Sequence, residues 1–201
     1  MVLITIDGNI GSGKTSVLNF LHRNYKIPVD LEPVESWNSY LSDLYNDSSN
    51  VFKFQIRVWL DRCWIQEKTH NINIFVERSP KFIQGVFIDI AEETNMISAN
   101  EKEILLDLHK KTDKSWENAI QIMLRSSPEN CFQRIKKRNR ESEKHITEKY
   151  IQKLHEKHEQ ICNDLIKEGK NIIIIDVDNK NISDIASDIL KLTNECINQK
   201  I

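Results

Sequence analysis

A chain of 201 residues can form one large domain or two small ones, and we predict a single domain over 1–201 because no Gly/Ser-rich or Pro-rich linker divides it. The formal net charge of −2 argues against a general nucleic-acid binder, which needs a basic excess. No apolar run approaches the length of a membrane span, and the first predicted strand leaves no room for a leader peptide. We therefore expect a cytoplasmic protein without a membrane or nucleic-acid partner. The four cysteines lack C-x-x-C or metal-ligand spacing, and we expect reduced thiols.

Apolar runs and helical periodicities alternate along the chain. Short runs rich in β-branched residues predict strands at 2–6, 27–31, 72–76, 119–124 and 171–175. Helical patterns predict helices at 17–25, 36–45 with Ser36 as its cap, 51–68, 100–111, 151–165 and 182–190. Ser79-Pro80 and Ser127-Pro128 are typical of a cap followed by proline in the first helical turn, the second helix running to Arg138. This alternation predicts an α/β fold: a five-stranded parallel sheet flanked by helices, with ligands at the carboxyl ends of its strands.

The loop after the first strand matches the phosphate-binding pattern G-x-x-x-x-G-K-[ST]. Its glycines let the backbone turn N–H groups toward a polyphosphate, and the following helix points its positive end at the same anion. We expect Lys14 to bridge the β- and γ-phosphates of ATP and the Thr15 hydroxyl to ligate Mg²⁺. A chance Gly-rich turn is the alternative, but strand, loop and helix stand in the order that phosphate binding requires. The predicted ATP-binding loop comprises Gly8, Asn9, Ile10, Gly11, Ser12, Gly13, Lys14 and Thr15.

Charged residues follow three other predicted strands and should meet at the same edge of the sheet. Glu32 is either a general base for a hydroxyl that attacks the γ-phosphate or an exposed loop acid. Glu77, which precedes Arg78, and Asp176 compete for the role of Mg²⁺ carboxylate. The residues alone leave both questions open.

Two further patterns have a functional and a structural interpretation. Gln55, Val58, Trp59 and Arg62 share one face of the long predicted helix, which suits either a nucleobase edge or the solvated border of a core helix. The basic residues between Arg134 and Lys144 suit either a solvent-facing helix end or mobile cations that close over a nucleotide.

Several motifs also line up in order along the chain. They are the phosphate loop, Glu32-Pro33-Val34 with Trp37, Phe54-Gln55, Glu77-Arg78-Ser79, 134–143, Tyr150, Leu154-His155 and His158-Glu159. Together they resemble the deoxyribonucleoside kinases, the group with the deoxycytidine, deoxyguanosine and mitochondrial thymidine kinases and the insect multisubstrate enzyme. The resemblance implies a three-layer P-loop NTPase fold with an arginine-rich lid at about 135–148.

The resemblance also implies a role for each matching position. Glu32 would be the general base for the 5′-hydroxyl, Arg78 would hold that hydroxyl and the phosphate, and Glu77 would be the carboxylate on the Mg²⁺ side. Gln55 would read the base between aromatic walls, and Tyr45 with Glu143 would bind the 3′-hydroxyl. The lid arginines would be Arg134, Arg138 and Arg140. The full implied nucleoside site is Glu32, Trp37, Tyr45, Phe54, Gln55, Val58, Arg62, Arg78, Ile83, Phe87 and Glu143.

The sequence departs from the family pattern at positions that bear on the substrate. Arg62 matches the deoxycytidine and deoxyguanosine kinases, whereas Ile83 replaces the aspartate that cooperates with that arginine. Gln84 replaces an arginine that usually follows the Glu-Arg-Ser motif, and the spacing from Tyr45 to Gln55 is one residue short. The preferred base therefore stays open, with pyrimidines weakly favoured because Ile83 would crowd a larger ring.

We expect an ATP- and Mg²⁺-dependent deoxynucleoside kinase of nucleotide salvage, and the resemblance suggests a homodimer. A nucleoside monophosphate kinase similar to thymidylate kinase is the nearest alternative, but it would place a substrate phosphate where Glu32 stands. A GTPase-type regulatory module is a further alternative. It would need an [NT]-K-x-D motif, and the run Asn179-Lys180-Asn181-Ile182 lacks the aspartate.

Overall fold

The computed structural model describes residues 2–63, 73–112 and 114–198. Its centre is a five-stranded parallel sheet in the order β2-β3-β1-β4-β5. The strands are β1 Leu3–Gly8, β2 Val29–Asp30, β3 Ile74–Glu77, β4 Ile120–Arg125 and β5 Ile172–Asp176. Because β1 lies between β3 and β4, the loop that leaves it sits at the middle of the carboxyl edge of the sheet.

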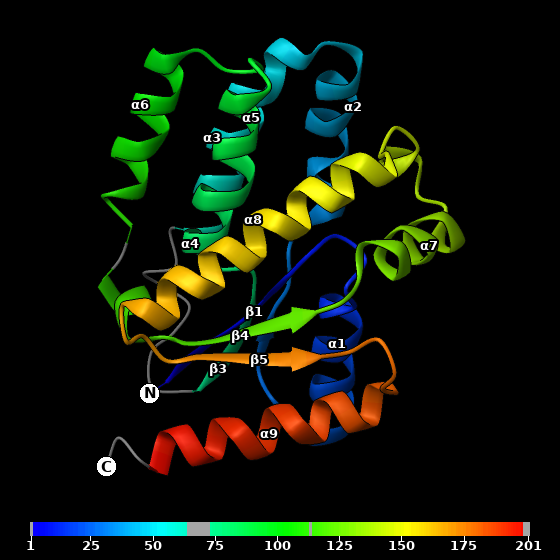
Figure 1. The fold of residues 1–201 in the computed structure, drawn as a ribbon, viewed down its shortest axis with the longest axis vertical. Coiled ribbons are helices and arrows are strands. Elements are labelled where there is room, and N and C mark those ends of the chain that lie inside the picture. The colour runs from blue at the N-terminus through cyan, green and yellow to red at the C-terminus, as the bar shows by residue number, and fades with distance from the viewer. Residues whose placement is uncertain (1, 64–72, 113, 199–201) are drawn as a thin grey trace.

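Helices cover the sheet on both faces and make three layers (Figure 1). One face carries α1 Lys14–Tyr25 and α9 Ile182–Asn198, which pack on each other and on the strands. The helices of the other side are α2 Asn38–Asn46, α3 Val51–Arg62, α4 Pro80–Phe82, α5 Asp89–Glu93, α6 Ala99–His109, α7 Pro128–Arg138 and α8 Glu148–Lys167. This arrangement confirms the predicted fold class.

Alternating residues of β4 show why the sheet needs cover on both faces. Ile122 and Leu124 belong to the core beneath α1 and α9, whereas Met123 packs with Phe82 of α4 and Leu154 of α8. Successive side chains of a strand point to opposite faces, so a strand in the middle of a sheet must be apolar on both. The near-continuous apolar runs that predicted the strands have this origin.

Local signals placed most helix starts correctly. The Ser79 hydroxyl accepts a hydrogen bond from the N–H of Phe82, and the Ser127 hydroxyl accepts one from Asn130, as expected of the two caps. Ser36 does not cap a helix, which corrects the prediction. It lies inside a 3-10 turn, Val34–Trp37, where its N–H donates to the carbonyl of Pro33, and α2 follows that turn.

Of the helix predicted over 51–68, the structure shows α3 as far as Arg62, with Cys63 at its end. The predicted residues 64–68 lie outside the described part of the chain. The capping box of α6 begins at Ser98, whose hydroxyl and backbone exchange hydrogen bonds with Glu101. Among the described residues no helix has the length and apolar character needed to span a bilayer. All four cysteines are free thiols.

A widened turn interrupts the helical segment that follows β3. Between α4 and α5 the residues Ile83–Ile88 form a π-helix, which holds one residue more than an α-helical turn. Gly85 lies in this turn against α8, where an added Cβ would stand 2.8 Å from Cδ1 of Ile161. The glycine therefore lets the π-helix pack directly on α8.

Candidate active site

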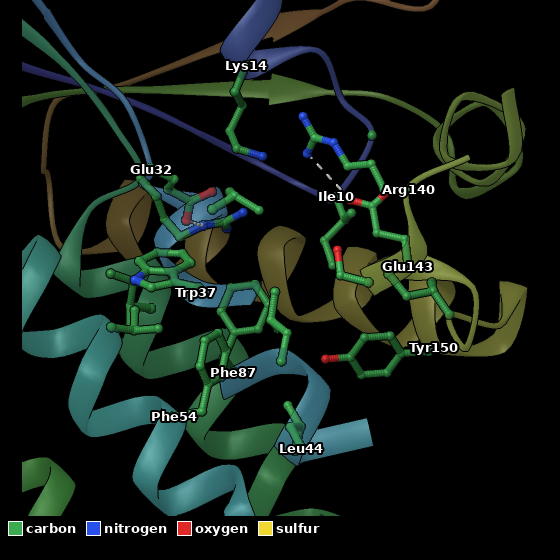
Figure 2. Close-up of a pocket in the computed structure, with 18 of the residues that line it drawn as sticks. Ile10, Lys14, Glu32, Trp37, Leu44, Phe54, Phe87, Arg140, Glu143 and Tyr150 are labelled. Carbon is green, nitrogen blue, oxygen red and sulfur yellow. Dashed lines mark hydrogen bonds and ion pairs between the residues drawn. The ribbon is translucent and has the colours of Figure 1, made fainter. Parts of the chain in front are cut away.

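A cavity of about 830 Å³ opens at the carboxyl edge of the sheet. The phosphate-binding loop, the segments after β2 and β3, helices α2 and α3, the π-helix and the turn after α7 form its walls. Figure 2 shows Lys14 and Glu32 near one another, with Arg140, Glu143 and Tyr150 across the space and the rings of Trp37, Phe54 and Phe87 along its side. One end of the cavity is charged and the other is apolar.

The phosphate-binding loop has the backbone geometry that the motif predicts. Gly8, Gly11 and Gly13 have φ values of 145°, 84° and 97°, in the region that side chains disfavour. Gly11 also lies so close to the first turn of α7 that an added Cβ would stand 2.5 Å from the carbonyl oxygen of Cys131. The loop is therefore packed against the helix that leads into the predicted lid.

Lys14 is folded over the loop and almost completely buried. Its ammonium donates to the carbonyl oxygens of Gly8 and Asn9, both at 3.0 Å. Burial, with the nearby cation of Arg78, lowers the pKa of Lys14 to about 8, although Glu77 and Glu32 oppose the shift. Within residues 2–63, 73–112 and 114–198 no carboxylate forms an ion pair with this ammonium, and a bound polyphosphate would provide one more anionic partner.

The order of the strands places Glu77, and not Asp176, beside Thr15. Glu77 ends β3, the neighbour of β1, and its Oε1 accepts a 2.7 Å hydrogen bond from the hydroxyl of Thr15. Asp176 ends the edge strand β5, is exposed, and faces Arg125 at 3.7 Å. A hydroxyl and a carboxylate in contact at the start of α1 are hard oxygen donors of the kind that Mg²⁺ prefers.

Glu32 is not an exposed loop acid. Its side chain is 12% exposed, and its Oε1 accepts a 2.6 Å hydrogen bond from Nε of Arg78. Burial alone would raise the pKa of Glu32, but the cations of Arg78, Lys14 and Arg62 outweigh it, so the pKa lies below its ordinary value. An ionised, partly shielded carboxylate beside the phosphate loop can accept a proton from a hydroxyl held there.

Arg78 has an unusual backbone conformation. Its φ is +67°, and this turn aims the side chain back at Glu32 while the guanidinium carbon lies 4.8 Å from the ring centre of Phe87. A left-handed conformation at a bulky residue costs of order 1–3 kcal/mol and persists where the surroundings hold it. We call Lys14, Thr15, Glu32, Glu77 and Arg78 the strand-end cluster.

The apolar end of the cavity holds the predicted aromatic residues. Trp37 and Phe54 meet edge to face, with ring centres 5.8 Å apart, and Phe87 lines the same space. Gln55 is buried in this wall, and its Oε1 has no hydrogen-bond partner among the described residues. A buried acceptor without a partner is costly, so the amide is suited to a ligand that donates a hydrogen bond there. Val58 and Ile83 complete the predicted apolar set.

The structure does not bring Arg62 into this cavity. Its guanidinium is 1% exposed and is bound to Asp30 and to backbone carbonyls at the ends of β2 and β3. The expectation that Arg62 contacts a nucleobase is therefore not supported by its position. The helical face that carries Gln55 and Val58 lines the site, but Arg62, one turn further on, points toward the sheet edge.

The lid residues pair chiefly with one another. Arg138 donates to both carboxylate oxygens of Glu143, at 2.6 and 2.5 Å, and Arg140 lies 3.7 Å from the same group (Figure 2). We call these three residues the lid cluster; all of them line the cavity. Arg134 does not line it, but donates to the carbonyl of Gly11 in the phosphate loop. The side chain of Tyr45 falls outside the described part of the structure.

Sequence reasoning missed three residues that shape the site. Asp7 is fully buried in β1, where its carboxylate accepts hydrogen bonds from the N–H of Ser79 and the hydroxyl of Thr5. Desolvation by burial raises the pKa of Asp7, although these hydrogen bonds act to lower it. A charged residue inside an apolar strand was the available signal. Asp61 accepts a hydrogen bond from the indole N–H of Trp37 at 2.8 Å and has no local sequence signal. Tyr150 stands among the motifs that carry the family resemblance but was given no role in the site; it lines the cavity from the first turn of α8.

Comparison with known proteins agrees with this geometry. The family model described as deoxynucleoside kinase matches residues 4–201. A kinase-like protein of invertebrate iridescent virus 3 is 28% identical over 94% of this chain and 95% of its own length. Human mitochondrial thymidine kinase 2 is 25% identical over 88% of this chain and 71% of its own.

A solved structure shares the fold. It is deoxyadenosine kinase from M. mycoides, determined with dCMP and a flexible dCDP bound. Its TM-score is 0.82 at 23% identity, with 97% of this chain and 100% of that chain covered.

Proposed function

Because the chain belongs to the deoxynucleoside kinase family, whose members are ATP-dependent phosphotransferases, we propose that it phosphorylates the 5′-hydroxyl of a 2′-deoxyribonucleoside. One observation carries the proposal. The ionised Glu32, held by Arg78, stands between the phosphate-binding loop and an apolar cavity that contains the unpaired amide oxygen of Gln55. A nucleoside seated with its base at Gln55 would present its primary alcohol to Glu32.

The strand-end cluster accounts for the chemistry of the transfer. Glu32 accepts the proton of the 5′-hydroxyl while the hydroxyl oxygen forms a bond to the γ-phosphorus. The bond from that phosphorus to the β–γ bridging oxygen breaks, and ADP is released. Lys14 and Arg78 neutralise negative charge on the transferred group, and such charge stabilisation is the main catalytic contribution in phosphoryl transfer. Arg78 also keeps Glu32 ionised and oriented.

Thr15 and Glu77 fit a magnesium ion. Their oxygens are 2.7 Å apart, and the Thr15 hydroxyl oxygen and a carboxylate oxygen of Glu77 would hold the ion. When bound, Mg²⁺ would supply positive charge that offsets part of the negative charge of the phosphates.

We propose a weak preference for pyrimidine bases. The amide of Gln55 offers an NH₂ donor group and a carbonyl acceptor, which can pair with the edge of a pyrimidine. The buried Ile83 packs with Trp37 and Val58 in the same lining and would crowd a larger ring. The M. mycoides deoxyadenosine kinase, solved with dCMP and dCDP, is consistent with cytosine-sized ligands in this fold. A role in nucleotide salvage, a cytoplasmic location and a homodimer belong to the same proposal.

A turnover assay on the purified full chain tests the function. With ATP and Mg²⁺, we expect monophosphate products from thymidine and deoxycytidine, lower kcat/KM with the deoxypurines, and no diphosphate from dTMP. Lys14→Ala serves as a control against contaminating kinases, with kcat lowered at least about 100-fold. Use of dTMP but not thymidine would instead identify a monophosphate kinase. Nucleotide binding without any transfer would favour a regulatory module.

A further inference from the structure

Arg62 lies in the last turn of α3, away from the cavity, yet it is among the most buried side chains of the protein. A guanidinium is expensive to bury unless its donors are paired. Nη1 donates to a carboxylate oxygen of Asp30 and to the carbonyl of Leu31, both at 3.1 Å. Nη2 donates to the carbonyl of Glu77 at 2.8 Å and reaches that of Asp30 at 3.4 Å.

These contacts lie where two neighbouring strands stop pairing. The ladder between β2 and β3 ends with Asp30 opposite Val76. Beyond that pair the segment after β2 leads to Glu32, and β3 continues through Glu77 to Arg78. Arg62 therefore links the strand ends at the point where backbone hydrogen bonds no longer do.

Two peptide groups are held on both sides by this arrangement. In the peptide between Leu31 and Glu32, Arg62 holds the carbonyl oxygen, and the N–H donates to Oε2 of Glu77 at 3.3 Å. In the peptide between Glu77 and Arg78, Arg62 again holds the oxygen, and the N–H donates to the carbonyl of Ile6 at 3.0 Å. The second peptide leads into the left-handed turn at Arg78, whose φ needs such support.

We propose that Arg62 is a positioning residue for phosphoryl transfer, which fixes Glu32 and Arg78 in register by holding the carbonyls that precede both of them. The inference rests on the proposed kinase function, and it gives this arginine a role that does not involve the base. Small displacements of reacting groups are costly in catalysis, so loss of the link should act on the chemical step.

The experiment compares Arg62→Met and Arg62→Lys with the unmodified protein, using thymidine, deoxycytidine and deoxyadenosine. For Arg62→Met we expect kcat to fall about 100-fold, and this factor should be the same for each nucleoside. We expect each nucleoside KM to change by less than about threefold. Arg62→Lys keeps the charge opposite Asp30 but lacks the forked donors, so its loss should be intermediate. Lys53→Met, which removes an exposed cation from the same helix, should leave kcat unchanged.

The possible outcomes separate the inference from the function beneath it. An inactive unmodified protein would remove the proposed function itself. If the unmodified protein is active, a fall in kcat/KM that differs between the bases, or that comes from a higher KM, would mean that Arg62 contacts the substrate. That result would overturn the inference. The inference would also be overturned by a variant that has a lower melting temperature but an unchanged kcat per active site. Active sites would be counted by titration with a tight-binding nucleotide. If Arg62→Met does not fold, Arg62→Lys alone decides between these outcomes.

Discussion

The strand-end cluster and the lid cluster carry charges of both signs, but the fold holds them differently. Glu32 and Arg78 are 12% and 4% exposed and lie just after the strands β2 and β3. Arg138 and Arg140 are 33% and 45% exposed, and both pair with Glu143 in the turn after α7. The side chains of Glu32 and Arg78 are shielded at the sheet edge, whereas those of Arg138 and Arg140 are partly exposed and held by Glu143. We infer that the sheet edge sets the chemical step and that the lid sets substrate capture.

Glu32→Gln tests the fixed side of this comparison and should have the largest effect. The amide cannot accept the hydroxyl proton, so we expect kcat to fall about 100-fold or more, with nucleoside affinity retained. Single-turnover rates and direct binding measurements would separate the two quantities. Glu35→Gln, the same change three residues away on an exposed side chain, is the matched control. Near-normal turnover in Glu32→Gln would remove Glu32 from the role of base.

Glu143→Gln tests the lid side and should have a smaller effect of a different kind. It weakens the ion pairs to Arg138 and Arg140 and would weaken the contact to the 3′-hydroxyl that the family resemblance implies, so we expect nucleoside KM to rise about tenfold. kcat should change far less than in Glu32→Gln. Glu141→Gln, an exposed acid in the same turn, provides the control in steady-state assays. A fall in kcat as large as that of Glu32→Gln would end the distinction between the clusters.

His158 provides the mildest test, through stability. Its ring is buried on α8, stacks on Phe82 with ring centres 5.5 Å apart, and bonds the carbonyl of Leu154 through Nδ1 at 2.6 Å. Burial, aided by the cation of Arg78, lowers its pKa from 6.5 to about 3. The unfolded chain therefore binds a proton that the folded chain does not, and the stabilisation, complete above pH 6.5, is lost progressively as the pH falls toward 3.

Urea unfolding at several pH values between 7.5 and 5 measures this dependence. In His158→Gln one titrating group is lost. The slope of the unfolding free energy against pH should therefore fall by up to about 1.4 kcal/mol per pH unit. His109, whose pKa burial lowers to about 4, would still contribute its share. His22→Gln, at an exposed position on α1, should keep the parental slope. An unchanged slope in His158→Gln would mean that the buried ring does not oppose protonation.

The parts of the fold that were predicted from sequence are those with local causes. The phosphate-binding loop and the caps at Ser79 and Ser127 depend on residues within one turn of each other. The choice between Glu77 and Asp176 required the strand order, because alternation of strands and helices does not reveal which strand borders β1. The capping box at Ser98 was visible as a serine three residues before a glutamate, and the predicted helix nevertheless began later.

Arg62 shows the limit most clearly. Its helical phase matches Gln55 and Val58, so spacing alone places it on the ligand-facing side. Its partners are the last residues of two strands, Asp30 and Glu77, and Leu31 just after the first of them; Glu77 is fifteen positions away. The direction taken by a long side chain at a helix end depends on which acceptors the packed sheet offers, and that information arises only with the tertiary structure.

The π-helix at 83–88 has a consequence for how such a protein can diversify. Ile83 at its start and Phe87 near its end both line the cavity. Removing one residue between them would restore ordinary helical winding and change the directions of the two side chains relative to each other. Insertions and deletions at this turn would thus rebuild the pocket without replacing any residue that lines it, so chain length here is as much a determinant of ligand choice as residue identity.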